Sequence, residues 1–275
     1  MYLFMKKFLK KNVSSIFPNI IRYLRQYIAT RQASRPQVLE NGIIFYGLQN
    51  IANYEPHVLS NLIKLSKGHD NFINVGANHG FYIFSLQHNF KKNIAIEALR
   101  DNSEIIAKNI FINNLQKRVF LHPLACSEKN EVLNFYGASS GGSLLMGFNE
   151  QYDDGSFVQA IKLDQIKNLH LKDESALYLI DVEGSEYSVL KGATKIIEAA
   201  NSTFVIEICC REYMPNEVFN EDFSHIFKLF FDHGYIANEI MTDASLSKLT
   251  LSDIQRMISD NRYSGMMVIF QPNRS

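Results

Sequence analysis

Short apolar runs alternate with amphipathic stretches from about residue 70 onward. Strands are predicted at residues 72–75, 94–96, 118–121, 176–180, 203–208, 235–241 and 266–270. Between most of them, apolar residues recur every three or four positions, which predicts helices. This alternation is typical of an α/β fold with a doubly wound, mostly parallel seven-stranded sheet that binds ligands at the carboxyl ends of its strands. The last two strands leave room for only a short helix between them, which allows one antiparallel edge strand.

The first 40 residues differ from the rest of the chain. Apolar residues recur at helical spacing from Ile16 to Tyr27, which predicts an amphipathic helical arm over residues 1–40, followed by one domain over 41–275. Eight of the 28 Lys and Arg residues lie before residue 40, and none of the 28 Asp and Glu residues does. This arm either lies on an anionic membrane surface or packs on its own domain with the basic face in solvent.

Composition indicates a cytoplasmic protein. No run of about 18 uncharged apolar residues is present, and the N-terminus lacks the apolar core and cleavage site of a signal peptide. The three cysteines, Cys126, Cys209 and Cys210, have no metal-ligand spacing, and an odd number of cysteines fits reduced thiols. We therefore expect no metal. Contact with the inner face of the membrane through residues 1–35 is the alternative to a wholly cytoplasmic location.

The stretch N-F-I-N-V-G-A-N-H-G, residues 71–80, predicts a buried strand and a tight glycine turn before a helix. A second apolar run ends in Glu97, 21 residues after Gly76. A carboxylate at about this spacing reaches a ribose in nucleotide-binding folds. The dinucleotide fingerprint G-x-G-x-x-G needs its second glycine where this chain has Asn78, whose side chain occupies the space of a pyrophosphate.

These residues favour S-adenosylmethionine over a dinucleotide. This cofactor has no phosphate, its ribose needs an acceptor such as Glu97, and its amino-acid end suits Asn74 and Asn78. The alternative is a glycine turn that only joins a strand to a helix. His79 either reaches a substrate or forms a hydrogen bond inside the turn.

Acidic residues lie at the carboxyl ends of several predicted strands, namely Glu97, Asp181, Glu183 and Glu207. Four acids beside a turn without Lys or Arg favour a cationic or polyhydroxyl ligand. If the site removes a proton from a substrate, Asp181 is the first choice for the general base because it is nearest to its strand end. Glu183 would then hold the substrate group that reacts. The alternatives are structural. Glu183 and Glu186 could interact with the positive N-terminal end of the next helix, for which Ser185 is the expected cap, and Glu207 could lie in solvent at its strand end.

Two loops fall near this predicted site. Residues 123–127 lie at the carboxyl end of the third strand, where an adenine could bind. Residues 139–143, S-S-G-G-S, join two alternating segments at 131–136 and 157–163. This polar loop either covers the pocket or is a plain hairpin connection.

Several motifs together resemble the FkbM family of methyltransferases. They are N-V-G-A-N-H-G (74–80), I-E-A (96–98), L-D (163–164), I-D-V-E-G-S-E (180–186), V-L-K-G-A (189–193) and I-E-I (206–208). The resemblance covers about residues 54–210, and the D-V-E-G-x-E-x-x-V-L-K-G-A block is its most specific part. The family usually has Asp where this chain has Asn74, and Glu-Pro where it has Glu97-Ala98.

The resemblance implies a Rossmann-like class I fold and an S-adenosylmethionine-dependent O-methyltransferase. Its acceptor would be a hydroxyl of a glycan, including surface polysaccharide, or of a secondary metabolite, and not a nucleic acid. The expected catalytic residues are Asp181 and Glu183. The expected cofactor-binding residues are Asn74, Gly76, Ala77, Asn78, Gly80, Glu97, Ala98 and Ala125.

Two other functions stay open at this point. An NAD-dependent oxidoreductase is disfavoured by Asn78 in the turn. A non-catalytic, membrane-associated ligand-binding protein is suggested by the basic arm, but the acidic strand ends argue against it.

Overall fold

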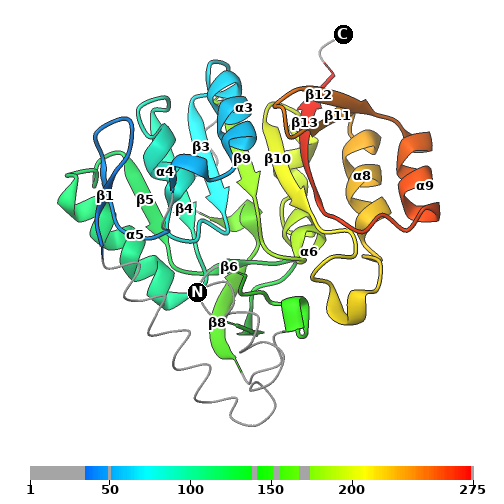
Figure 1. The fold of residues 1–275 in the computed structure, drawn as a ribbon, viewed down its shortest axis with the longest axis horizontal. Coiled ribbons are helices and arrows are strands. Elements are labelled where there is room, and N and C mark those ends of the chain that lie inside the picture. Colours follow the sequence, from blue (N-terminus) through cyan, green and yellow to red (C-terminus); the bar gives the residue numbers. More distant parts are fainter. Residues whose placement is uncertain (1–34, 49–50, 138–140, 151–154, 167–173, 274–275) are drawn as a thin grey trace.

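The computed structural model of this chain describes residues 35–48, 51–137, 141–150, 155–166 and 174–273 (Figure 1). Nearly all of the basic arm predicted over residues 1–40 lies outside these ranges, so its packing and its membrane contact stay predictions. Among the described helices, none has the length and apolar character needed to cross a membrane.

A large mixed sheet forms the centre of the protein (Figure 1). Its strands, in spatial order, are β12 (Leu246–Leu249), β11 (Tyr235–Ile240), β13 (Met266–Pro272), β10 (Thr203–Ile208), β9 (Ala176–Ile180), β3 (Asn71–Val75), β4 (Lys92–Ile96) and β5 (Val119–His122). The five strands from β10 to β5 are parallel to one another. The parallel core of the predicted sheet is therefore confirmed.

The far side of the sheet differs from the prediction in two respects. The sheet has eight strands rather than seven, because the short β12 pairs with β11. β12 has the sequence L-S-K-L and is mostly exposed, so its apolar pattern is too weak to identify it as a strand. The antiparallel strand β13 is also not at an edge but between β10 and β11, because Met266 to Phe270 are buried and need cover on both faces.

Helices cover both faces of this sheet, as the doubly wound prediction requires. One face packs on α3 (Pro56–Ser66), α4 (Phe81–Leu86), α5 (Arg100–Ile112) and the hairpin of β1 (Gln37–Val38) and β2 (Ile44–Phe45). The other face packs on α6 (Glu186–Lys191), α7 (Thr194–Glu198), α8 (Phe223–Asp232) and α9 (Leu251–Ser259). Neighbouring residues of one strand enter different cores: Phe72 packs with the first group and Ile73 with the second.

The helix expected after residue 185 is two short helices, α6 and α7. α6 ends at Gly192, where a Cβ atom would lie 2.2 Å from the carbonyl oxygen of Ser127. The predicted Ser185 cap is wrong, since its side chain makes no capping hydrogen bond. Instead, the Glu186 carboxylate accepts the Gly184 N–H at 2.7 Å.

A second, three-stranded sheet lies below the large sheet in Figure 1, where β8 is labelled. It contains β6 (Ala125–Cys126), β8 (Ser156–Ile161) and β7 (Glu131–Phe135), with β7 antiparallel to β8. The two alternating segments of the sequence therefore do pair as strands. Short 3₁₀ helices cover Ile51–Asn53, Phe148–Glu150, Leu163–Gln165 and Pro215–Glu217.

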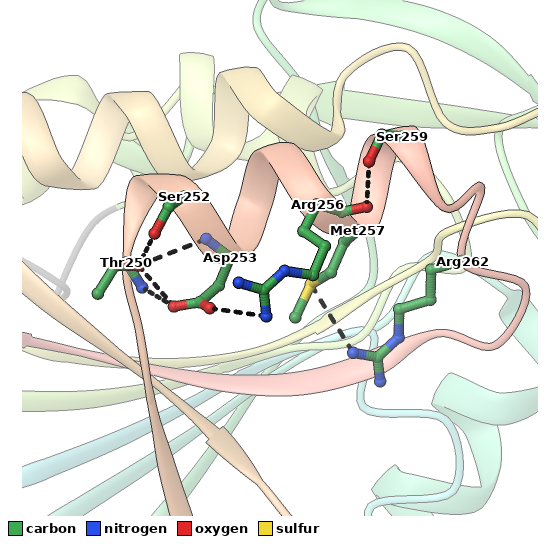
Figure 2. A network of polar contacts seen from close by, with 7 residues as sticks. All are labelled: Thr250, Ser252, Asp253, Arg256, Met257, Ser259 and Arg262. Atoms are coloured by element: carbon green, nitrogen blue, oxygen red, sulfur yellow. Dashed lines mark hydrogen bonds and ion pairs between the residues drawn. The ribbon is translucent and has the colours of Figure 1, made fainter.

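Helix α9 begins with a capping box, shown in Figure 2. The Thr250 hydroxyl accepts the Asp253 N–H at 3.4 Å, and the Asp253 carboxylate accepts the Thr250 N–H at 2.9 Å. Arg256 lies 3.8 Å from the same carboxylate. These contacts satisfy N–H groups that the first turn leaves unpaired, and they fix α9 with Ile254 buried against the second core.

Candidate active site

A cavity opens at the carboxyl ends of β3, β4 and β9. Its space, open solvent included, is about 610 Å³, within the range of small-molecule sites. Predicted site residues that line it are Gly76, Asn78, Glu97, Ala98, Ala125, Asp181 and Glu183. Three other predicted residues, Asn74, Ala77 and Gly80, lie in the same strand and turn without lining the cavity.

The turn after β3 needs its glycines. Gly76 has a φ of 81°, and a Cβ atom there would lie 1.8 Å from the carbonyl oxygen of Asp181 on the neighbouring strand. Gly80, with a φ of 85°, precedes α4 and packs on Phe84. Asn78 also has a positive φ, 51°, which asparagine tolerates better than most residues. The turn can therefore bring backbone and the Asn78 side chain to the cavity wall.

Glu97 is fixed at the end of β4. Its side chain is buried, and its two carboxylate oxygens accept the backbone N–H groups of Asn78 at 2.7 Å and Leu99 at 2.8 Å. The Oε1 atom also accepts the Asn102 side-chain N–H at 3.4 Å. Burial raises the pKa of Glu97 to about 7, against the opposing effect of these three hydrogen bonds. The Oε2 atom accepts one hydrogen bond and keeps a second lone pair, so Glu97 can still accept a hydroxyl of a bound diol.

Two amide oxygens near the turn have no protein partner. The Oδ1 atoms of Asn74 and Asn78 are buried without a hydrogen bond among the described residues. Buried polar atoms in native proteins are generally paired, so the unpaired Oδ1 of Asn78, which lines the cavity, is consistent with a ligand there. The Nδ1 atom of His79 is likewise buried without a hydrogen bond among the described residues, and burial lowers the pKa of His79 to about 4. His79 does not line the cavity.

Acidic side chains meet on the far side of the cavity. Ile180 lies opposite both Val75 and Ile206, so the next residues of the three strands, Asp181, Gly76 and Glu207, form one row. The carboxyl groups of Asp181 and Glu207 form a hydrogen bond. Burial, and then the neighbouring acids, raise the pKa of Asp181 well above its usual range, and burial also raises the pKa of Glu207. Both shifts favour the protonated forms of this pair.

Glu183 lies two residues after Asp181 and, like Asp181 and Glu207, is half-buried. Its φ is 55°, a conformation that is uncommon for glutamate and often found at functional sites. Its carbonyl oxygen accepts the Ser143 hydroxyl at 2.6 Å. Burial, followed by the charges of Glu207 and Glu55, raises the pKa of Glu183 to about 7. A carboxyl group with this pKa is partly ionised at neutral pH.

Sequence reasoning did not identify Glu55, Tyr54 or Tyr82 as part of this acidic region. Glu55 accepts a hydrogen bond from the Tyr82 hydroxyl, and its charge raises the pKa of Asp181, Glu183 and Glu207. Pro56 stands at the start of α3, directly after Glu55. No local signal marked Glu55 itself, because it reaches the site through the packing of α3 on the sheet. Glu207 did carry a signal, its position at a strand end, although no role was assigned to it.

Two loops border the cavity where the sequence placed them. Leu124, Ala125 and Cys126 line it beside Glu97. Of the S-S-G-G-S loop, Gly141 and Gly142 line the cavity, while residues 138–140 lie outside the described residues. The described part of this loop therefore borders the pocket rather than only joining two strands.

The doubly wound sheet, with a glycine turn and an acid at the end of the next strand, defines the S-adenosylmethionine-binding fold of class I methyltransferases. Residues 74–237, more than half of the chain, match the methyltransferase FkbM domain, and the chain belongs to that family. The predicted family and fold class are thereby confirmed. The match also favours a methyltransferase over an NAD-dependent oxidoreductase.

Solved structures show distant similarity. An FkbM methyltransferase from Methylobacillus flagellatus KT is 15% identical with a TM-score of 0.45, covering 74% of this chain and 44% of its own. An O-methyltransferase from Bacillus cereus in complex with SAH is 12% identical with a TM-score of 0.43, covering 96% of both chains. TrmK from M. capricolum with S-adenosyl-homocysteine is 12% identical with a TM-score of 0.41, covering 78% of this chain and 68% of its own. This chain thus spans less than half of the M. flagellatus protein, and no curated protein sequence matches it.

Proposed function

We propose that this protein transfers the methyl group of S-adenosylmethionine to a hydroxyl of a glycan, including surface polysaccharide, or of a secondary metabolite. The observation that carries the proposal is the shared cavity. Glu97 and Asn78 line it on one side, and Asp181 and Glu183 line it on the other. A cofactor and an acceptor bound on these two sides would meet at the ends of β3 and β9.

The residues at the cavity fit S-adenosylmethionine. The buried, unpartnered Oδ1 of Asn78 suits an ammonium group, and the remaining lone pair of Glu97 Oε2 suits a ribose hydroxyl. Leu124, Ala125 and Cys126 offer an apolar wall for the adenine. Among the cavity-lining residues that the structure describes, none is Lys or Arg, which agrees with a ligand that has no phosphate.

Bound S-adenosylmethionine supplies an electrophilic methyl group. The protein aligns the acceptor hydroxyl with it, and alignment of reactants is worth about 7–11 kcal/mol. A neutral hydroxyl must also lose its proton. We assign the base to Glu183 rather than to Asp181, because burial and the neighbouring acids raise the pKa of Asp181 well above its usual range and favour its protonated form, whereas the pKa of Glu183 is about 7. The Asp181–Glu207 pair would hold the acceptor.

Transfer of labelled methyl groups tests this proposal. The purified full-length chain is incubated with S-adenosylmethionine carrying an isotopic methyl label and with surface-glycan extracts, and products are identified by mass spectrometry. We expect label in an ether that survives mild alkali, which hydrolyses a methyl ester. A Glu97→Ala variant should incorporate much less label at the same cofactor concentration. Label on nitrogen or in an ester would contradict O-methylation.

Binding measurements address the remaining alternatives. We expect calorimetry to show binding of S-adenosylmethionine and no binding of NAD. A protein that binds S-adenosylmethionine but labels no hydroxyl in any glycan or metabolite extract would be better described as a non-catalytic ligand-binding protein.

A further inference from the structure

The turn that carries Glu183 has a backbone conformation that needs support from its surroundings. Glu183 has a φ of 55° and Gly184 a φ of 95°, so two consecutive residues lie in the left-handed region. A glutamate in this region persists only where neighbouring groups hold it there. Because Glu183 also lines the cavity, the contacts that hold this turn decide where its carboxylate lies.

A buried serine from another part of the chain supplies such a contact. The Ser143 hydroxyl donates a hydrogen bond to the Glu183 carbonyl oxygen at 2.6 Å and accepts the Leu145 N–H at 2.9 Å. The hydroxyl is therefore used both as a donor and as an acceptor, which fixes its direction. Ser143 is only 1% exposed, and a hydrogen bond away from water is electrostatically stronger than one in solvent.

The segment around Ser143 is itself fixed. Its backbone N–H donates to the Tyr136 carbonyl oxygen at 2.9 Å, and its carbonyl oxygen accepts the Tyr136 N–H at 2.7 Å. Further along the chain, Phe148 is fully buried and packs on the turn: a Cβ atom on Gly184 would lie 2.9 Å from its ring. Residues 143–148 thus hold the turn by a hydrogen bond at one residue and by packing at the next.

The neighbours of Ser143 border the same cavity. Gly142 and Leu144 line it, whereas Ser143 between them bonds to Glu183. Gly142 leaves no room for a side chain, because a Cβ atom there would lie 2.4 Å from the ring of Phe135, another lining residue. Alternate residues of one segment therefore border the space for the ligand and hold the turn of the acid that faces it.

We propose that Ser143 is a positioning residue of the methyl-transfer site: its hydroxyl holds the Glu183 backbone so that the Glu183 carboxylate faces the acceptor. This inference rests on the proposed function, in which Glu183 takes the acceptor's proton, and Ser143 acts only through Glu183. The acceptor oxygen loses its proton to Glu183 as it bonds to the methyl carbon. The bond between that carbon and sulfur breaks, and its electron pair stays on sulfur.

The Glu183 carbonyl can be observed alone, which tests the hydrogen bond without an acceptor. Glu183 and Gly184 form the single Glu-Gly pair in the sequence. The cofactor-free full chain, labelled with ¹³C in the backbone carbonyl of glutamate and with ¹⁵N in glycine, therefore gives one carbonyl-to-amide NMR correlation. In Ser143→Ala we expect its ¹³C resonance to move upfield, because the carbonyl loses a hydrogen bond. Ser143→Thr keeps the hydroxyl and should keep the signal, and Ser156→Ala removes an exposed hydroxyl from β8 and should leave it unchanged.

Methyl transfer provides a second readout once an acceptor is identified. Ser143→Ala should lower kcat at least about tenfold, since misplacement of a reacting group by about 1 Å can cost about 10²-fold. The Kd of S-adenosylmethionine should change little, and Ser143→Thr should restore kcat. A merely structural serine would lower the melting temperature of Ser143→Ala but leave the kcat of the folded protein at the wild-type value, which would overturn the inference.

The NMR signal has its own contradicting outcomes. The inference is overturned by an unchanged signal in Ser143→Ala, by an equal shift in Ser156→Ala, or by a Ser143→Thr signal at the Ser143→Ala position. If Ser143→Ala does not fold, as judged by its melting curve, Ser143→Cys places a weaker donor at the same position and provides the same comparison. An unchanged signal there would also overturn the inference. Failure of the proposed function looks different: the carbonyl signal moves as expected, but no hydroxyl receives labelled methyl.

Discussion

Single carboxyl groups decide the chemistry available at this cavity, because burial sets their protonation. Glu97 is buried but receives two backbone N–H groups, which favour its charged form. Asp181 is half-buried next to another acid, and both effects favour its protonated form. Glu183 has a pKa of about 7, so it is partly ionised at neutral pH. Three acids that look equivalent in the sequence therefore have three different roles in the proposed mechanism.

The role of Glu97 is open to direct measurement. Glu97→Ala removes the proposed acceptor of the ribose hydroxyls, and each hydrogen bond to a charged group is worth about 1.5–3 kcal/mol. We expect calorimetry to show S-adenosylmethionine affinity weakened at least about tenfold, with an unchanged circular dichroism spectrum. Glu104→Gln, an exposed acid on the following helix, is the matched control and should bind normally. Equal affinity in wild type and Glu97→Ala would reject the assignment.

Substitution of the two cavity acids separates the base from the acceptor-holding residue. General-base catalysis contributes about 10²–10⁴-fold, so Glu183→Gln should lower kcat by at least about 10² with little change in cofactor affinity. Asp181→Asn should act more on the KM for the acceptor. The measurement is steady-state methyl transfer to an identified acceptor. A larger loss of kcat in Asp181→Asn would return the base to Asp181, as the sequence alone suggested.

At the scale of elements, contacts at the ends of strands and helices position the residues of the site. The turn between β3 and α4 depends on close backbone contact with β9, which explains Gly76. α6 begins with the carboxylate of Glu186 on the Gly184 N–H instead of the expected serine cap. α9 has a complete capping box, although its sequence suggested only a short connecting helix.

The capping box of α9 gives a stability prediction. Thr250→Ala removes the hydroxyl that accepts the Asp253 N–H, and loss of such a cap typically costs about 1 kcal/mol. We expect a lower midpoint in urea with an unchanged slope. Ser259→Ala is the control, because that exposed hydroxyl bonds only to the Arg256 carbonyl oxygen at the other end of the helix (Figure 2). If the two variants lose the same free energy of unfolding, the capping hydrogen bond contributes no more to stability than the surface hydrogen bond of Ser259.

For the whole molecule, the concentration of buried acids should make stability fall with pH. Burial raises the pKa of Glu97 and Glu183 to about 7 and that of Glu186 to about 8, from 4.5. Between the unfolded pKa of 4.5 and the folded pKa of about 7 or 8, the folded state binds more protons than the unfolded state. The free energy of unfolding therefore decreases as pH rises and levels off above the folded pKa. Buried His79 has the opposite effect, but only below its unfolded pKa of 6.5.

Chemical denaturation of the cofactor-free protein between pH 6.5 and pH 8.5 checks this expectation. The free energy of unfolding should fall across the window, by up to about 1.4 kcal/mol per pH unit for each such carboxyl group. Glu186→Gln removes the group with the highest of these values and should flatten the decrease. If the variant shows the same pH dependence as the wild type, Glu186 is not protonated in the folded state.

The sequence by itself determined the parallel core of the sheet, the glycine turn and the strand-end acids. These depend on local chemistry: a β-strand that is buried on both faces is apolar throughout, and a turn in close contact with the next strand requires glycine. The motif spacing was also enough for the family. Glu97, Asp181 and Glu183 were therefore found as strand-end residues before any contact between them was known.

Only the tertiary structure decided which groups meet and which of them hold protons. β13 lies inside the sheet because burial on both of its faces favours an interior position. The sequence between β11 and β13 does not predict that β13 lies between β11 and β10. The charge of Glu55 raises the pKa of the acids near β9 and β10 only because α3 packs on the sheet. Protonation of the Asp181–Glu207 pair depends on desolvation and on the distance between two strands far apart in sequence. Local patterns encode neither quantity.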